Sequence, residues 1–166
     1  MKNKIIEESI TSLQQEGLRF SVDTLAERLK VSKKTIYKYF PTKEVLAYAI
    51  YEKFYRDLND KITNILQQQE ESLTEQLLFC YFDSAKMIRK EIFNKYCLNN
   101  IIGDFATQHH TEIWNTIESE ICNGLSHEEI RIYQLIIDGA FDRAIECDAN
   151  STTVIEMLRS IPVIQK

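Results

Sequence analysis

The chain has 166 residues, of which 44% are hydrophobic and 27% are charged, a composition typical of an ordinary folded protein. Four Gly and two Pro are too few for the many turns of a strand-rich protein, so we expect an all-α fold. The formal net charge of −5 would by itself argue against a nucleic-acid partner.

The charge is unevenly distributed along the chain. Residues 1–46 contain nine Lys and Arg against six Asp and Glu, whereas the other 120 residues contain 11 basic and 19 acidic groups. A small basic segment joined to an acidic body is typical of a phosphate-binding module attached to a second domain. The sequence therefore predicts two domains, at 1–46 and 47–166.

The first four helices are predicted from apolar periodicity and capping residues, over about 3–16, 22–29, 33–40 and 43–69. Ser21, Ser32 and Thr42 stand at N-cap positions, and Pro41 ends the third helix. The fourth helix has one apolar stripe, made of Leu46, Ile50, Phe54, Leu58, Ile62 and Ile65.

The second domain is also predicted to be helical. Capping boxes at 72–75 and 126–129 open helices that run to about residues 90 and 147. Two further helices are expected at about 91–99 and 105–122, with a break before Gly103, and a short last helix at about 151–161.

Residues 21–44, SVDTLAERLKVSKKTIYKYFPTKE, have the spacing of a helix-turn-helix unit. Two short helices that pack closely need a small residue at their crossing, which is Ala26, and apolar residues around it. The predicted interior is formed by Val22, Leu25, Leu29, Val31 and Ile36.

The outward face of the second helix is basic and aromatic. Lysines neutralise phosphates, while hydroxyl and phenol groups donate to phosphate oxygens or reach base edges. Ser32 also directs the positive end of the helix dipole toward the same side. The alternative is a generic helical hairpin with solvated lysines. The predicted DNA-binding residues are Ser21, Ser32, Lys33, Lys34, Thr35, Tyr37, Lys38, Tyr39 and Lys43.

Residues 2–46 resemble the DNA-binding domain of the tetracycline-repressor (TetR) family, most specifically in the run 31–44, VSKKTIYKYFPTKE. The resemblance implies that Tyr37 and Lys43 anchor phosphates beside Thr35, that Lys33 and Lys38 reach bases, and that Tyr39 lies at the edge of the contact. Ile36 and Phe40 take core positions.

Two residues depart from the family's pattern. Lys30 stands where the turn usually has Gly, so a non-Gly residue is expected at positive φ there. Lys34 replaces a usual Gly or Pro and adds a charge near the DNA.

The resemblance also implies a dimer formed through the last two helices, within 126–161, and a helical body that encloses a small apolar or amphipathic effector. The aromatic-rich helices at 73–122 are the expected pocket walls, although aromatic residues at helical spacing are more often core. A fully packed body without an effector and a helical protein–protein adaptor remain alternatives.

Other functions find little support in the sequence. No catalytic motif is present, and we expect neither an enzyme nor a cofactor. His109 and His110 point about 100° apart on a helix, so at most one can pair with Glu112, and we expect no metal site.

The location of the protein is predicted from the same sequence. The cysteines at 80, 97, 122 and 147 contain no C-x-x-C pair and are expected to be buried thiols in a reducing compartment. The longest apolar run, 77–82, is too short to span a bilayer, and the N-terminus lacks the apolar stretch of a signal peptide. We therefore expect a cytoplasmic protein with no membrane association.

Overall fold

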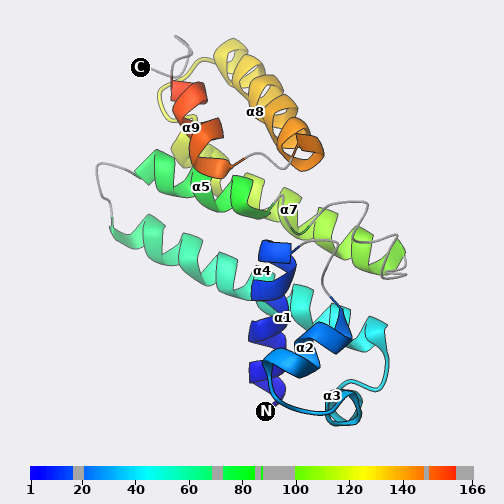
Figure 1. Ribbon diagram of the computed structural model, residues 1–166. Coiled ribbons are helices and arrows are strands. Elements are labelled where there is room, and N and C mark those ends of the chain that lie inside the picture. The colour runs from blue at the N-terminus through cyan, green and yellow to red at the C-terminus, as the bar shows by residue number, and fades with distance from the viewer. Residues whose placement is uncertain (17–20, 69–72, 85–86, 88–99, 148–149, 160–166) are drawn as a thin grey trace. The chain divides into compact units, whose positions relative to one another are not determined.

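The structure is a computed structural model and describes residues 1–16, 21–68, 73–84, 87, 100–147 and 150–159 (Figure 1). Within these ranges the chain forms helices and the turns between them, with no strand. The expectation of an all-α fold with an N-terminal helix-turn-helix domain is therefore confirmed.

The chain divides into two compact units, one of residues 1–57 and 87–108 and the other of residues 58–86 and 109–166. The first unit contains α1 (Lys2–Glu16), α2 (Val22–Arg28) and α3 (Lys33–Tyr39), and the second contains α5 (Leu73–Ser84), α8 (His127–Cys147) and α9 (Ser151–Arg159). Two long helices, α4 (Lys43–Gln68) and α7 (Asn100–Ile121), contribute residues to both units. The domain boundary at residue 46 stays a prediction.

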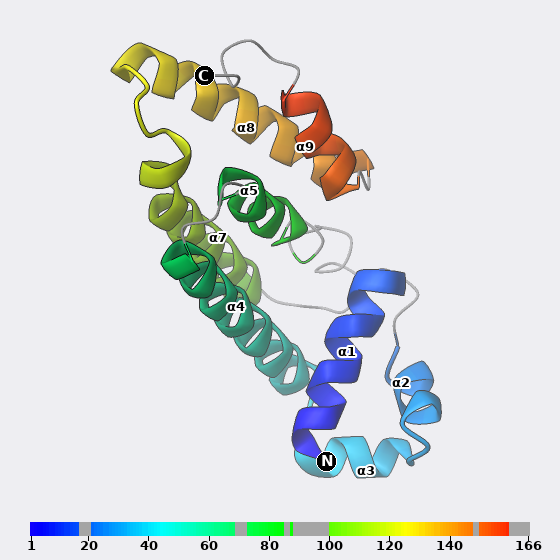
Figure 2. The same ribbon diagram turned by 90° about the vertical axis from the view of Figure 1, so that its left-hand side faces the viewer.

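The core of the first unit joins α1, α2 and α3 (Figure 2). Ile5 of α1, Leu25 of α2 and Ile36 of α3 are completely buried, and Ala26 is nearly so. Val22, Leu29 and Val31, which were also expected inside, are half-buried. Further along the chain, the buried Tyr51 hydroxyl donates to the Met87 carbonyl oxygen at 2.6 Å.

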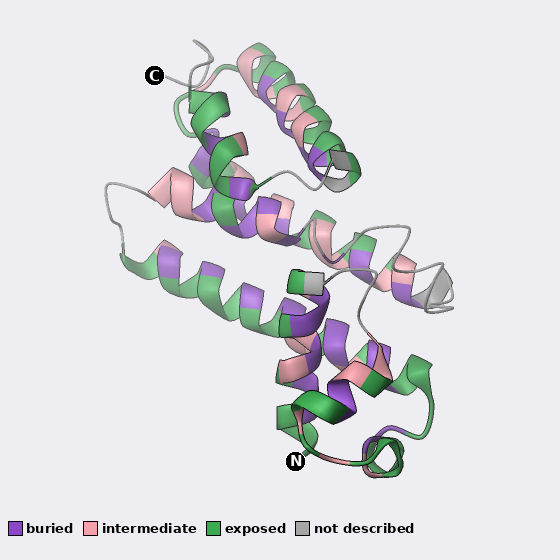
Figure 3. Ribbon diagram, viewed as in Figure 1, coloured by how far each residue is buried: buried purple, intermediate pink, exposed green. Residues whose placement is uncertain are grey.

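The apolar stripe predicted on α4 is buried along its whole length, and the buried positions lie on one side of the helix (Figure 3). The opposite side is charged and exposed and contains the i, i+4 ion pair Glu52–Arg56, and a second such pair, Lys53–Asp57, lies beside the stripe. A helix of 26 residues with this pattern takes its stability mainly from the buried face.

The core of the second unit is aromatic. Tyr81 of α5 lies with its ring centroid 5.2 Å from Trp114 of α7 and 4.9 Å from Phe141 of α8. Phe82 packs edge-on against Tyr81, and both are buried. These aromatic residues contact one another, as core residues do.

One predicted helix start needs correction. The α7 helix begins at Asn100, so Gly103 lies inside it and the break expected there was wrong; no atom lies within 4 Å of the position of a Cβ on Gly103, and one interior glycine costs only about 1 kcal/mol. The α5 helix has the bounds Leu73–Ser84, and residues 85–86 and 88–90 of the predicted helix lie outside the described residues. The Ser84 hydroxyl donates to the Tyr81 carbonyl oxygen.

The predicted helix at 91–99 and the capping box at Ser72 lie outside the described residues. The capping box at Ser126 is confirmed. The Ser126 N–H donates to Glu129 Oε2 at 2.8 Å, and the Glu129 N–H donates back to Ser126 Oγ at 3.3 Å. Helix α9 begins at Ser151 as predicted and is described as far as Arg159, and the last two residues of the predicted helix lie outside the described residues.

Candidate nucleic-acid interface

The turn between α2 and α3 sets the angle at which α3 is presented. Leu29 caps the C-terminus of α2, and the next residue, Lys30, has φ 54°. The Lys30 N–H donates to the Glu27 carbonyl oxygen at 3.0 Å and the Val31 N–H to the Ala26 carbonyl oxygen at 2.9 Å, so the chain reverses with its backbone groups satisfied. The positive φ expected at this lysine is confirmed.

Helix α3 has only seven residues, and both of its ends are fixed. At its start the Ser32 hydroxyl accepts from the Thr35 N–H at 3.1 Å and shares a 2.9 Å hydrogen bond with the Thr35 hydroxyl. At its end the Phe40 N–H donates to the Ile36 carbonyl oxygen at 3.0 Å. Because Ile36 and Phe40 are buried, one side of α3 is anchored in the unit and the other side faces solvent.

The solvent-facing side of α3 is formed by Lys34, Tyr37 and Lys38. At 100° per residue these three positions fall within about a third of a turn of one another, opposite Ile36. The Tyr37 side chain is 36% exposed, which leaves its phenol group accessible. We call Lys34, Tyr37 and Lys38 the basic face of α3.

Lys33 and Tyr39 flank this basic face. Lys33 forms an ion pair with Asp23 of α2, a contact that the sequence reading did not anticipate. Both side chains are exposed, and an exposed pair is worth only about 0–1 kcal/mol, so it leaves Lys33 able to exchange its partner for a phosphate or a base. Tyr39 is exposed at the end of the helix.

The remaining predicted contacts are at helix starts. Ser21 caps α2 by accepting from the Thr24 N–H at 3.1 Å, and Ser32 caps α3, so both serines have a structural role that does not depend on DNA. Lys43 is exposed at the start of α4, where the Thr42 hydroxyl accepts from the Val45 N–H at 3.3 Å. A hydrogen bond from the Thr42 side chain and one from the Glu44 backbone at the start of the helix lower the pKa of the Glu44 carboxyl group.

Three contacts that the sequence did not indicate fix α1 against the helix-turn-helix. The Lys2 ammonium lies 5.7 Å from the centroid of the Phe40 ring. Arg28 donates to Ser12 Oγ at 3.1 Å and to Glu8 Oε1 at 3.3 Å. The residues in each contact are 16 or more positions apart in the chain, so no local pattern indicates them.

The histidines at 109 and 110 have separate partners. His109 Nδ1 lies 3.0 Å from Glu112 Oε2, so one histidine pairs with this glutamate as expected. The His110 ring is stacked on Phe141 at 3.9 Å between centroids and contacts the Ser84 and Tyr81 hydroxyls at 3.1 and 3.0 Å. Burial lowers the pKa of His110 to about 4.

The described part of the chain contains no cluster of three or more potential metal ligands from His, Cys, Asp and Glu. Cys80 and Cys122 are buried free thiols, and the side chains of the other two cysteines are outside the description. No helix among the described residues is long and apolar enough to cross a membrane.

Comparison with known proteins identifies the N-terminal domain. Residues 5–50 match the family of bacterial regulatory proteins of the tetR type, which confirms the resemblance seen in residues 31–44. The chain is 24% identical over 121 residues to the uncharacterized HTH-type transcriptional regulator YvaF of Bacillus subtilis. That match covers 73% of this chain and 60% of the length of the relative.

A solved structure shares the fold. The crystal structure of a TetR/AcrR-family transcriptional regulator from Aquifex aeolicus superimposes with a TM-score of 0.61 at 20% identity, over 95% of both chains. The similarity of fold therefore extends beyond the helix-turn-helix domain to the helices that follow it.

Proposed function

We propose that the chain is a DNA-binding transcriptional regulator of the tetR family of bacterial regulatory proteins, whose N-terminal domain residues 5–50 match, and that it acts in the cytoplasm. The observation that supports this most strongly is the basic face of α3, which is exposed on a short helix whose two ends and opposite side are fixed. A helix of this kind fits the major groove of duplex DNA.

In this proposal the side chains divide into two roles. Tyr37 and Lys43, with Thr35 beside them, hold phosphates and set the register of the domain on the duplex. Lys33 and Lys38 reach base edges, Lys34 adds charge next to them, and Tyr39 contacts the edge of the site. Ser21 and Ser32 present the starts of α2 and α3 to the phosphates.

We further propose that the protein is a two-fold symmetric dimer. The face of α8 opposite its core contains apolar residues in solvent: Leu135 is 75% exposed and Ile132 is 43% exposed. Gly139 lies on the same face, and no atom lies within 4 Å of the position of a Cβ there, so a second helix can approach closely. A second copy of this face is the natural cover for it, because an isologous contact repeats the same patch on both subunits.

A dimer also meets a requirement of DNA recognition. One recognition helix contacts too few bases for useful specificity, whereas two heads on half-sites about 34–36 Å apart read a palindrome. Selection of bound duplexes from a random pool tests this. The proposal requires an enriched palindrome with two half-sites; a pool that stays random after several rounds contradicts it.

The regulatory part of the proposal is repression that a small apolar or amphipathic effector relieves. A ligand can shift the protein toward a state that does not bind DNA only by as much as it prefers that state. Helix α4 begins beside the recognition helix and contributes residues to both units, so we propose it as the element that transmits the change.

Three of the aromatic residues of the helices at 73–122 do not support a role as pocket walls, because Tyr81 packs against Phe82 and Trp114, and also against Phe141 of α8. This packing favours the alternative of a regulator whose aromatic core holds no ligand. Any effector then binds elsewhere in the second unit. Binding of the selected operator in the presence of candidate molecules separates the two cases.

A further inference from the structure

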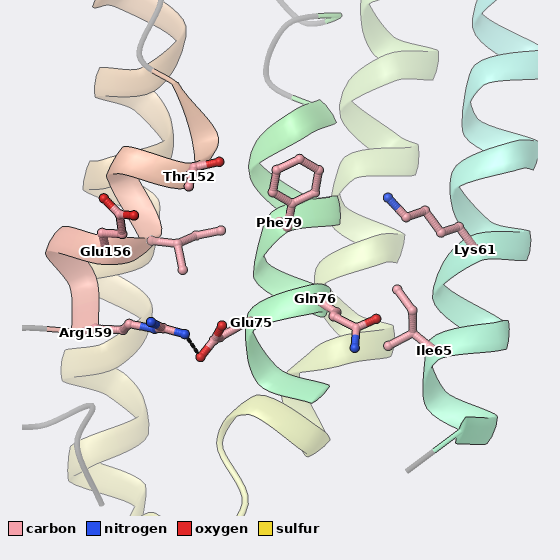
Figure 4. A pocket seen from close by; sticks show the side chains of 9 residues that line it. Lys61, Ile65, Glu75, Gln76, Phe79, Thr152, Glu156 and Arg159 are labelled. Atoms are coloured by element: carbon pink, nitrogen blue, oxygen red, sulfur yellow. Dashed lines mark ion pairs between the residues drawn. The ribbon is translucent and has the colours of Figure 1, made fainter. Parts of the chain in front are cut away.

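A hollow of small-molecule size lies among the described residues of the second unit, with a lining that does not include the aromatic core. Its volume is about 410 Å³, toward the small end of the roughly 300–1,000 Å³ typical of ligand sites. It lies over the outer side of α5, with α4 on one side and α9 on the other (Figure 4). We call it the α5 groove. Its lining residues are Lys61, Ile65, Glu75, Gln76, Phe79, Thr152, Ile155, Glu156 and Arg159.

The apolar part of the α5 groove is a strip of three side chains from three helices. Phe79 of α5 is 37% exposed, although an aromatic ring of this size is usually buried. In Figure 4 the Phe79 ring lies between Thr152 of α9 and Lys61 of α4. Ile65 and Ile155 add aliphatic surface from α4 and α9. The strip can cover an apolar group of a ligand.

The charged groups of the α5 groove are of two kinds. Arg159 and Glu75 form an ion pair across one end, and their charges cancel. Lys61 and Glu156 have no partner of opposite charge among the described residues: Lys61 lies 5.2 Å from the centroid of the Phe79 ring and interacts with Cys80, and Glu156 is exposed. Lys61 therefore stands as a cation on the α4 side and Glu156 as an anion on the α9 side, and neither is in an ion pair with another described residue (Figure 4).

This arrangement selects for a ligand with both charges. A pure anion would satisfy Lys61 and bring a second negative charge beside Glu156, and a pure cation would do the reverse beside Lys61. A zwitterion satisfies both, because opposite charges at its two ends meet opposite charges on the two walls. Its apolar side chain would lie on Phe79, Ile65 and Ile155.

We propose that the α5 groove binds a small zwitterion of the amino-acid or dipeptide class with an apolar side chain, its carboxylate toward Lys61 and its ammonium toward Glu156. The proposed role of this ligand as an effector rests on the proposed function of the protein as a regulator. The binding itself does not, and it is measured on the protein alone.

The experiment is isothermal titration calorimetry of the full chain with the dipeptide L-leucyl-L-phenylalanine and its capped forms. N-acetylation removes the ammonium, and C-terminal amidation removes the carboxylate. The free dipeptide is expected to bind with a measurable Kd, and each cap is expected to weaken binding about tenfold or more, as loss of a charge-assisted contact does.

Variants test the orientation. In Glu156→Gln the acetylated and free forms should bind equally, because the partner of the ammonium is gone, and in Lys61→Met the amidated and free forms should bind equally. Lys53→Met, at a half-buried lysine of α4, and Glu120→Gln, at an exposed glutamate of α7, change charges outside the groove and should behave as the unchanged protein. Thermal unfolding of each variant checks that it folds.

Three results would overturn the inference: no binding of the free dipeptide at millimolar concentration, no effect of either cap, or caps that act equally in all variants. DNA binding measured on the same samples keeps the two proposals apart. Intact DNA binding without dipeptide binding contradicts the α5 groove only, and dipeptide binding without DNA binding contradicts the proposed function only.

Discussion

At the residue scale, Tyr37 and Lys38 illustrate how two neighbours on one exposed face take different roles. Tyr37 has an aromatic body and one polar tip, which suits a fixed contact with a phosphate oxygen. Lys38 has a long flexible stem that can reach a base edge, and both residues lie opposite the buried Ile36. Their substitutions should therefore differ in kind as well as in size.

We predict that Tyr37→Ala weakens binding to every duplex by a similar factor, about tenfold, as loss of a charge-assisted hydrogen bond does. Lys38→Ala should in addition change which bases are preferred at one position of each half-site. Gel-shift titrations against the selected operator and its single-base variants measure both effects, and Lys53→Ala is the control. Full affinity in Tyr37→Ala, or an unchanged preference in Lys38→Ala, would contradict the assigned roles.

His110 is a second residue with a defined chemical state. The Ser84 hydroxyl donates to the Tyr81 carbonyl oxygen, so Ser84 Oγ is left to accept from the Nδ1–H of His110. Nε2 then accepts from the Tyr81 hydroxyl. This network fits a neutral imidazole that donates through Nδ1–H and accepts at Nε2.

This state makes the stability of the protein depend on pH. Burial lowers the pKa of His110 from 6.5 to about 4 in the folded protein, so the unfolded chain binds the proton more tightly. The stabilisation is complete above pH 6.5 and is lost as the pH falls toward 4, by at most about 3 kcal/mol. Asp138 and Asp142, whose charges raise the pKa of Tyr81, lie near the same cluster.

Urea unfolding between pH 7 and pH 4 tests this prediction. In His110→Gln the free energy of unfolding should fall less steeply over that range than in the unchanged protein. His127→Gln, which alters an exposed histidine at the start of α8, is the control. Equal slopes in the His110→Gln variant and the unchanged protein would show that this imidazole does not titrate as described.

At the scale of elements, the helix-turn-helix was the part most fully predicted from sequence. Ser21, Ser32 and Thr42 act as caps as expected, and the predicted bounds of α2 and α3 are correct to within one residue. These features follow from residues only a few positions apart. The position of Lys30 in the left-handed region was also predicted, because the family that the sequence resembles usually has Gly at this turn.

Features that join distant positions could not be read in this way. The Lys33–Asp23 ion pair, the contact of Lys2 with Phe40 and the α5 groove depend on how helices pack, and periodicity does not determine packing. The helix break at Gly103 was wrong for a related reason. A glycine lowers helix propensity only locally, and a helix of 22 residues with buried Ile113 and Ile117 compensates for it.

The turn at Lys30 gives a prediction for this element. Lys30→Gly should leave stability unchanged or raise it by less than about 1 kcal/mol, because relief of the left-handed strain outweighs the greater entropy of the unfolded glycine. Lys30→Val should lower stability by about 1–2 kcal/mol, because a β-branched residue tolerates positive φ worst. Urea unfolding of both variants measures the difference. A valine variant as stable as the glycine variant would contradict the backbone conformation.

At the scale of the whole molecule, the proposed dimer depends on the exposed face of α8. We predict that Leu135→Arg, which places a charge on each side of the two-fold axis, converts the dimer to a monomer. Val45→Arg is the matched control, because Val45 is 48% exposed on α4 and lies outside that face. Light scattering at micromolar concentration reports the mass of each. A monomeric unchanged protein, or a dimeric Leu135→Arg variant, contradicts the proposed interface.

The central claim is that the basic face of α3 and Lys43 bind duplex DNA, and its most direct test is the salt dependence of that binding. Fluorescence anisotropy with the selected operator should show the logarithm of the association constant falling linearly with the logarithm of salt concentration. Lys43→Ala should make this slope shallower by about 1 for each head that loses its phosphate contact. Binding that salt does not weaken, or a slope unchanged in Lys43→Ala, would contradict the account.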